Sequence, residues 1–121
     1  MQKDNLISEA LEAALDKKAQ DAVVIDLAGV CSFTDHFIIC TGASTRQNQA
    51  IADAVAERLR LVGTRPLHIE GYSEGEWILM DYVHFVVHIF LARTREFYDL
   101  ERLWRAGKRH PADEFVGQRA V

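Results

Sequence analysis

The sequence predicts a single α/β domain of the α+β type, in which flanking helices pack on one mixed five-stranded sheet. Three observations predict this class. Apolar residues recur at helical spacing in two long segments, short β-branched runs separate the helical segments, and no repeat or low-complexity stretch divides the chain. The expected order of elements is αββαβββα. With 121 residues, 49% of them hydrophobic, the chain is large enough to bury a core without disulfides.

The N-terminal part predicts one helix and two strands. Apolar residues over positions 5–19 fall on one helical face, and Asp4 or Asn5 is available as the N-cap. Two β-branched or apolar runs follow at Ala22–Leu27 and Phe37–Thr41, and both have the composition of buried strands.

A second helix is predicted after Ser44. Ser44 and Gln47 have the spacing of a capping box, in which the Ser44 hydroxyl accepts the Gln47 N–H and the Gln47 side chain returns to the Ser44 N–H. Gly63 is placed to cap the C-terminus of this helix. We expect the helix to be a right-handed crossover that joins parallel strands at Phe37–Thr41 and Leu67–Ile69.

The C-terminal part predicts a hairpin and a last helix. The strands are expected at Trp77–Tyr82 and Phe85–Leu91, the helix from Thr94 to Trp104, and the short connections favour antiparallel pairing. Residues 106–121 are charged and are interpreted as a flexible tail, so the domain is expected to span residues 1–105.

Charge favours a protein partner over a nucleic acid. Residues 1–92 hold 7 Lys/Arg and 13 Asp/Glu, whereas residues 93–121 hold 7 and 5, which together give the net charge of −4. An acidic body is a poor surface for phosphates but suits a basic protein. We therefore expect no sequence-specific binding of nucleic acid.

The chain is expected to be cytoplasmic. The N-terminus has no basic start followed by an apolar run, and no segment has the apolar length needed to cross a bilayer. Cys31 and Cys40 have no metal-ligand spacing, so each is interpreted as a small buried hydrophobe.

No enzymatic constellation is complete in the sequence. A glycine turn at Gly42–Ser44 before a helix suits a phosphate, yet nucleotidyltransferases that use such a turn also need paired aspartates, and Asp81 is the only acid inside a later strand. His84 and His88 are four apart but on a predicted strand, which does not give metal-ligand spacing, and His88 is interpreted as a hydrogen-bonded, half-buried sheet residue. No Gly-x-Ser-x-Gly elbow is present. We expect a binding protein without catalytic residues, metal or cofactor.

The strand at Trp77–Tyr82 carries large apolar residues on both faces. Alternation puts Trp77, Leu79 and Asp81 on one face and Ile78, Met80 and Tyr82 on the other. One face packs on the helices; the other is covered either by the chain's own helices or by a partner, and periodicity favours neither interpretation.

Several segments, in order and at matching spacing, resemble the Iojap, or ribosomal silencing factor, family. The resemblance runs from about Leu6 to Trp104 and rests on the segments Phe33–Phe37, Cys40–Gln47, Glu70–Gly71, Trp77–Tyr82, Val86–Phe90 and Tyr98–Trp104. It implies a fold similar to that of nucleotidyltransferases without their catalytic acids. It also implies binding to the large ribosomal subunit through the ribosomal protein L-fourteen, which sterically blocks joining of the small subunit and represses translation, and a tendency to form homodimers.

Mapped onto this chain, the resemblance implies a contact surface around an apolar anchor, Trp77. Asp81 and Glu70 are expected to meet basic side chains of the partner. The other expected contact residues are Leu79, Met80, Tyr82 and Ser73, with Arg46 and Gln47 as weaker candidates.

Two alternatives to silencing remain open from the sequence. One is a nucleotide-binding or nucleotidyltransferase-like enzyme that acts at Gly42–Arg46, and the other is a factor for assembly of the large subunit. The pair Val83-His84 departs from the Gly-Asp turn of many family members, and a longer or bulged hairpin is expected there.

Overall fold

A computed structural model describes residues 3–116 of the chain. Its elements are α1 Lys3–Asp16, β1 Gln20–Asp26, β2 His36–Gly42, α2 Thr45–Leu61, β3 His68–Glu70, β4 Trp77–Asp81, β5 Phe85–Leu91, α3 Ala92–Tyr98, α4 Leu100–Leu103, β6 Lys108–Pro111 and α5 Asp113–Val116. None of the described helices is both long and apolar enough to cross a membrane.

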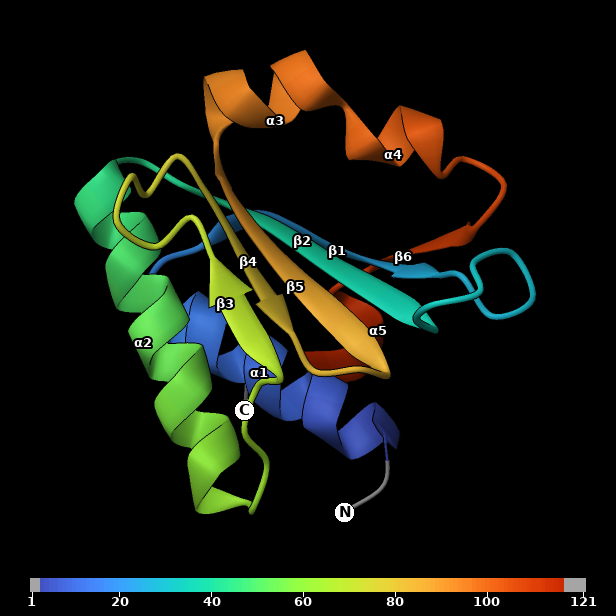
Figure 1. The fold of residues 1–121 in the computed structure, drawn as a ribbon, viewed down its shortest axis with the longest axis horizontal. Helices are drawn as coiled ribbons and strands as arrows, with labels where there is room; N and C mark the ends of the chain where they lie inside the picture. The colour runs from blue at the N-terminus through green and yellow to red at the C-terminus, as the bar shows by residue number, and fades with distance from the viewer. Residues whose placement is uncertain (1–2, 117–121) are drawn as a thin grey trace.

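The strands form one mixed sheet with the order β3-β4-β5-β2-β1-β6. β2 and β5 pair in parallel at the centre, and every other neighbouring pair is antiparallel. In Figure 1, α1, α2 and α5 cover one face of this sheet, and α3 and α4 lie across the other. The mixed α/β class is therefore confirmed, whereas the similarity to nucleotidyltransferases stays a prediction.

The sheet has six strands, and the expectation of five is wrong. The sixth, β6, pairs antiparallel with β1 from Val23↔Pro111 to Asp26↔Lys108. Gly107 makes this pairing possible, because a Cβ atom at this position would lie 2.8 Å from the Asp26 carbonyl and 2.7 Å from Leu27 Cδ2. Residues 108–116 thus belong to the fold rather than to a flexible tail, while residues 117–121 lie outside the described part.

The helix α2 crosses the sheet farther than expected. It leaves β2 and leads to β3, which runs in the same direction, but β4 and β5 lie between them in the sheet. The parallel neighbour of β2 is therefore β5. The sequence could not show this, because the strand that pairs with β2 is set by tertiary packing and not by the crossover helix alone.

Capping follows the sequence closely at α2. The Gln47 N–H donates to Ser44 Oγ at 3.0 Å, as expected, but Gln47 Oε1 accepts from the Ala43 N–H rather than from that of Ser44. At the other end, Gly63 at φ +87° and Thr64 complete the cap, since their N–H groups donate to the carbonyls of Arg60 and Leu59. By contrast, α1 begins at Lys3 and ends at Asp16, so the expected cap at Asp4 or Asn5 is wrong.

The β4–β5 hairpin is tight and regular, so the expectation of a longer or bulged loop is wrong. The Tyr82 N–H donates to the Phe85 carbonyl at 2.9 Å, and the ladder continues in register from Asp81↔Val86. Val83 adopts φ +75°, and the His84 N–H donates across it to the Tyr82 carbonyl. The strained backbone of Val83 thus forms a three-residue turn that joins β4 to β5 directly.

The last helix is broken in two. Asp99 has φ +50° and ψ +55° and ends α3, after which α4 begins. Leu100 and Trp104 pack on the sheet together with Phe37 and Phe90, whereas Phe97 is 80% exposed and Leu103 is 72% exposed. The expected continuous helix from Thr94 to Trp104 is therefore wrong.

Candidate partner-binding surface

Strand β4 divides its side chains as alternation predicts. Ile78 and Met80 are fully buried in the core under α1 and α2, and Tyr82 is 5% exposed in the same cluster. Trp77 and Leu79 are partly buried on the opposite face. Met80 and Tyr82 are therefore not surface residues, and their assignment to the partner contact is corrected: both belong to the core.

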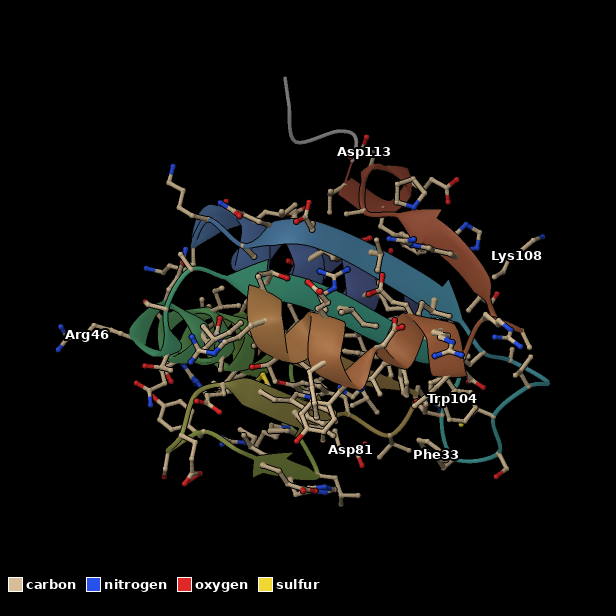
Figure 2. The ribbon with its side chains drawn as sticks, turned by 90° about the horizontal axis from the view of Figure 1, so that it is seen from above. Phe33, Arg46, Asp81, Trp104, Lys108 and Asp113 are labelled. Carbon is tan, nitrogen blue, oxygen red and sulfur yellow. The ribbon has the colours of Figure 1, made fainter. Side chains whose placement is uncertain are left out.

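The uncovered part of the sheet lies along β3 and β4, beside α3. Because directly opposed residues in antiparallel strands share a face, Leu79 lies beside Glu70, and Asp81 lies beside His68. His68 Nε2 is 2.8 Å from the Glu70 carboxylate, and its Nδ1 is 3.8 Å from that of Asp81. We call Glu70, Leu79 and Asp81 the acidic strip. Figure 2 shows Asp81 at the margin of the sheet that α3 and α4 leave open.

Asp81 also stabilises the turn between β4 and β5. One carboxylate oxygen accepts the Val83 N–H at 2.8 Å, which supports the strained hairpin turn. The second oxygen faces His68, and the side chain is 24% exposed. Asp81 therefore presents only part of its charge to solvent, while the side chain of Glu70 is 66% exposed.

Trp77 is not the free anchor that the sequence predicts. Its ring packs on that of Phe90, with ring centroids 4.9 Å apart, and on that of Tyr98 from α3, with ring centroids 4.8 Å apart. Its indole N–H donates to His88 Nδ1 at 3.1 Å. Trp77 thus supports the surface from below, and Tyr98, which is 49% exposed, lies over it.

His88 is hydrogen-bonded as expected, but it is buried rather than half-buried. Only 3% of the residue is exposed, and desolvation lowers the pKa of its imidazole to about 3. The ring is therefore neutral at neutral pH and can accept from Trp77 through Nδ1. Its own Nε2 has no hydrogen-bond partner among the described residues, and the Phe37 ring lies against it with centroids 4.5 Å apart.

Sequence reasoning missed the aromatic and apolar residues of α3 and α4. Phe97 and Leu103 are largely exposed on either side of the left-handed Asp99, and Tyr98, which packs on Trp77, is 49% exposed. We call these three residues the apolar ridge. A signal was present, since the segment from residue 94 to 104 holds more large apolar residues than one face of a single helix can bury.

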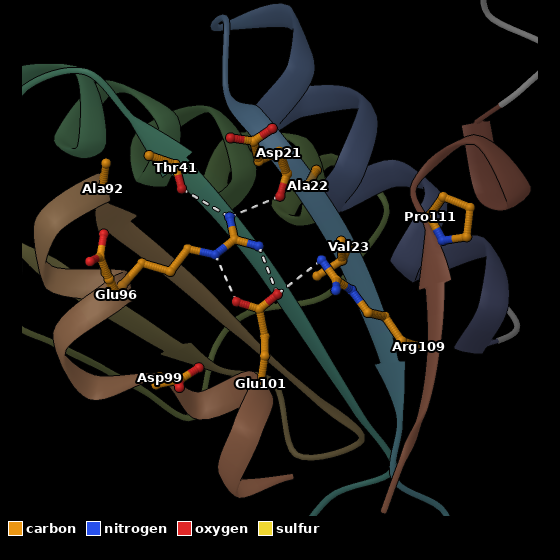
Figure 3. A pocket seen from close by; sticks show the side chains of 11 residues that line it. Asp21, Ala22, Val23, Thr41, Ala92, Glu96, Asp99, Glu101, Arg109 and Pro111 are labelled. Atoms are coloured by element: carbon orange, nitrogen blue, oxygen red, sulfur yellow. Dashed lines mark hydrogen bonds and ion pairs between the residues drawn. The ribbon is translucent and has the colours of Figure 1, made fainter. Parts of the chain in front are cut away.

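An arginine network holds α3 and α4 on the sheet (Figure 3). Arg95 donates from Nε and Nη2 to the two oxygens of Glu101 at 3.0 and 3.1 Å, and from Nη1 to Thr41 Oγ1 at 2.9 Å and to the Asp21 carbonyl at 2.8 Å. Arg109 of β6 forms an ion pair with the same Glu101, with Nη2 3.1 Å from Oε2. These residues line a hollow of about 450 Å³.

The charge in this hollow is already balanced. The hydrogen bonds from Arg95 lower the pKa of Glu101, which keeps its carboxylate ionised beside both arginines. Because the donors of Arg95 are taken by protein groups, the network acts as a clamp on α3 rather than as an open anion site.

The loop that carries Ser73 is fixed to α2. Gln49 Nε2 donates to the Tyr72 carbonyl at 2.8 Å, Asn48 Nδ2 donates to the Gly75 carbonyl at 2.8 Å, and the Tyr72 hydroxyl donates to Asp53. Gly71 is required at this point, since a Cβ atom there would lie 2.1 Å from the Trp77 carbonyl. Ser73 is exposed at the tip of this fixed loop.

The two weaker candidates lie apart from the acidic strip. Arg46 projects from the start of α2 at one end of the molecule (Figure 2). Gln47 is committed to its cap and donates to the carbonyls of Lys17 and Lys18. The structure therefore does not bring these residues together with Glu70 and Asp81.

The cysteines and the histidines form no reactive site in the described residues. Cys40 is fully buried, and desolvation raises the pKa of its thiol to about 12, whereas Cys31 is only partly buried. Within residues 3–116, no group of three His, Cys, Asp or Glu side chains is arranged to hold a metal ion.

Known proteins match this chain over most of its length. The sequence model described as RsfS, ribosomal silencing factor during starvation, matches residues 1–120. A ribosomal silencing factor of Bacillus subtilis is 36% identical over 104 residues, which cover 86% of this chain and 88% of that protein. A mouse protein named mitochondrial assembly of ribosomal large subunit protein 1 is 33% identical over 91 residues, which cover 73% of this chain and 40% of that protein.

Solved structures share the fold. A crystal structure of a protein from Chromobacterium violaceum matches with a TM-score of 0.84 at 36% identity, and the match covers 86% of this chain and 87% of that one. A crystal structure from Bacillus halodurans matches with a TM-score of 0.75 at 37% identity, covering 82% of this chain and 92% of that one.

Proposed function

This chain belongs to the ribosomal silencing factor family, and from that premise we propose that it binds the large ribosomal subunit through the ribosomal protein L-fourteen. Bound there, in the cytoplasm, it sterically blocks joining of the small subunit and so represses translation. The proposed contact is the acidic strip together with the apolar ridge beside it.

The observation that carries this proposal is the uncovered edge of the sheet at β3 and β4. Glu70 and Asp81 present carboxylates there, and Leu79 lies between them on the same face. A ribosomal protein that binds RNA carries basic residues, which such carboxylates can meet. Burial of apolar side chains at the centre with charges around them is the usual anatomy of a protein interface.

The apolar ridge supplies the aromatic part of the proposed contact. Tyr98 and Phe97 are the most exposed aromatic residues of α3, and Tyr98 is held in place by Trp77 beneath it. Aromatic side chains that are rigid before binding lose little conformational entropy on binding and often dominate interface energy. Trp77 therefore contributes through Tyr98 as well as through its own exposed edge.

A homodimer in the absence of ribosomes is part of the same proposal. Phe97 and Leu103 are largely exposed, and a second copy that covers them would remove a large apolar area from water. Concentration-dependent sedimentation of the isolated chain, with Phe97→Ser as the variant that dissociates the dimer, tests this part.

A role in assembly of the large subunit is the second candidate function. It is favoured by the mouse relative, whose name states assembly of the ribosomal large subunit. The two roles differ in substrate, because a silencing factor binds mature subunits. Binding to purified mature subunits therefore separates them.

The enzyme alternative is not favoured. Two N–H groups beside the proposed phosphate position are used in the cap, because Ala43 donates to Gln47 Oε1 and Gln47 donates to Ser44 Oγ. If millimolar ATP or GTP with magnesium raised the melting temperature of the chain, the non-enzymatic proposal would have to be revised.

The proposed contact is tested with charge-neutral variants that keep the shape of each side chain. Glu70→Gln with Asp81→Asn removes two charges, and the new amide at position 81 retains an oxygen for the Val83 N–H. The control pair, Glu57→Gln with Asp113→Asn, removes two exposed charges elsewhere. We expect the first pair to weaken co-sedimentation with large subunits by about tenfold or more and the control pair to have no effect.

A further inference from the structure

Positive charge gathers around α4 and at the β6 edge of the sheet. From Arg102 to Ala112 the sequence contains three arginines, one lysine and one histidine, and no acidic residue. The structure places this run on α4, on the turn after it and on β6. The run therefore forms one continuous piece of surface rather than a flexible tail.

Three of these cations have no ion pair in the described part of the chain. Arg102, Arg105 and Lys108 are exposed, and no carboxylate within residues 3–116 forms an ion pair with them. We call these three residues the basic end. By contrast, Arg58 binds Glu9 and Glu12, and Arg109 binds Glu101.

Asp26 and Lys108 form no ion pair in the described part of the chain. The two residues are opposite each other in the β1–β6 ladder, and the Asp26 carboxylate accepts the Ala28 N–H at 3.0 Å. Gly107 fixes the position of the turn between α4 and β6, because it approaches the Asp26 carbonyl at the end of β1 closely. The cations are thus presented on a rigid turn.

An exposed aromatic residue lies at the same end. Phe33, in the loop between β1 and β2, is 62% exposed, and its ring meets Trp104 edge to face with centroids 6.1 Å apart. Figure 2 shows Phe33 beside Trp104, with Lys108 farther along the same side of the molecule. Unpaired cations next to an exposed aromatic ring suit a nucleic acid, because phosphates pair with the cations and bases stack on the ring.

We propose that the basic end binds the phosphate backbone of RNA without reading its sequence. This inference rests on the proposed function, in which the acidic strip binds a basic ribosomal protein, and it assigns the basic end of the same molecule to ribosomal RNA. The acidic strip and the basic end have opposite charge, so each selects a different component of one ribosomal surface. RNA is favoured over an acidic protein because Phe33 offers a stacking surface beside the cations.

The first test does not need ribosomes. A short RNA duplex with a single-stranded overhang is titrated into the isolated chain at low salt, and backbone and indole NMR signals are followed. We expect shifts confined to residues 102–109, to the Trp104 indole and to Phe33, and we expect them to vanish at high salt. No shift, shifts elsewhere, or equal shifts with a poly-glutamate peptide would overturn the proposal.

The second test separates this proposal from the proposed function. The variant Arg102→Gln, Arg105→Gln and Lys108→Gln is compared with a control that removes three exposed cations elsewhere, Lys17→Gln, Lys18→Gln and Arg65→Gln. We expect the first variant to bind large subunits about tenfold more weakly, with a salt dependence reduced by roughly two to three counterions. We expect it to bind isolated L-fourteen no more weakly than wild type, because cations beside the apolar ridge do not attract a basic protein.

Each other outcome of the second test has a definite meaning. If both variants bind large subunits equally weakly, or if both bind them as strongly as wild type does, RNA binding at the basic end is contradicted. Failure of the wild-type chain to bind isolated L-fourteen contradicts the proposed function instead, and the RNA titration then still decides the present inference.

Discussion

Val83 lies in a backbone conformation that a β-branched residue rarely adopts. Its φ of +75° is in the region that favours glycine, and the side chain is half exposed. We expect Val83→Gly to stabilise the chain by about 1 kcal/mol, because the conformational penalty is removed and little buried contact is lost. Urea unfolding measures the change. The control Val30→Gly, at an exposed valine without positive φ, should destabilise, and an equal effect of both substitutions would contradict the account.

His88 makes the fold sensitive to acid. Burial lowers its pKa to about 3, below the value of about 6.5 expected in the unfolded chain. Between these values the unfolded chain binds the extra proton. The preference of the folded state for neutral His88 therefore contributes fully to the free energy of unfolding above about pH 6.5. As the pH falls toward the folded-state pKa, the free energy of unfolding decreases by up to about 1.4 kcal/mol per pH unit.

The substitution His88→Gln tests this linkage. A glutamine at this position keeps an acceptor for the Trp77 indole but has no proton to bind, so the stability of the variant should fall less between about pH 7 and about pH 5 than that of wild type. The same substitution at the exposed His84 is the control. Parallel pH profiles for His88→Gln and wild type would show that the buried imidazole does not govern the acid response.

Among the helices, α3 and α4 are held on the sheet by Arg95. Its side chain is 12% exposed and joins Glu101, Thr41 and the Asp21 carbonyl. Arg95→Met should cost about 3 kcal/mol, because the polar partners lose their bonds in a largely buried place. Urea unfolding gives the cost, and altered fluorescence of Trp77 and Trp104 would report the movement of α3. Arg93→Met, at a side chain 77% exposed, is the control and should change little.

β6 is held by the close approach of Gly107 to β1. Gly107→Val should destabilise the chain by about 1–3 kcal/mol, since a side chain there would meet the Asp26 carbonyl and Leu27. Hydrogen exchange should show loss of amide protection in β1 and β6. Ala106→Val, at the exposed neighbouring position, is the control, and equal loss with both variants would argue against a special role of Gly107.

The elements that the sequence predicted best are those specified by local signals. The cap at Ser44, the glycine at position 63 and the alternation on β4 all arise from residues close together in the chain, and the structure confirms them. β6 was missed because Lys108–Pro111 has no apolar alternation, and its pairing depends on β1, which is far away in the sequence. Likewise, nothing local signalled that Asp99 would break the last helix.

At the scale of the molecule, the candidate surface was only partly predictable. Alternation separated Trp77, Leu79 and Asp81 from Met80 and Tyr82, but periodicity could not tell which face α3 would cover. The structure shows that Tyr98 covers Trp77 and that Glu70 lies beside Leu79. The number of large apolar residues between positions 94 and 104 indicated that some of them would be exposed, but a helical pattern could not identify Phe97 and Leu103, which lie on either side of the break at Asp99.

Charge is separated across the molecule. The acidic strip lies at β3 and β4, whereas Lys108 of the basic end lies on β6 at the opposite edge of the sheet, and Arg102 and Arg105 lie on and after α4. A net charge of −4 hides this separation, because it averages the two ends. The arrangement is consistent with a protein that meets two components of opposite charge on one partner.

Steric blocking of the small subunit is tested by measuring subunit joining in the presence of the purified chain. Large subunits are incubated with the chain, small subunits are added, and joined ribosomes are separated from free subunits by sedimentation. The account predicts that the chain sediments with the large subunit, that joined ribosomes decrease, and that Glu70→Gln with Asp81→Asn restores joining. Undiminished joining with the chain bound to the large subunit would contradict steric silencing, and absence of binding would contradict the proposed contact itself.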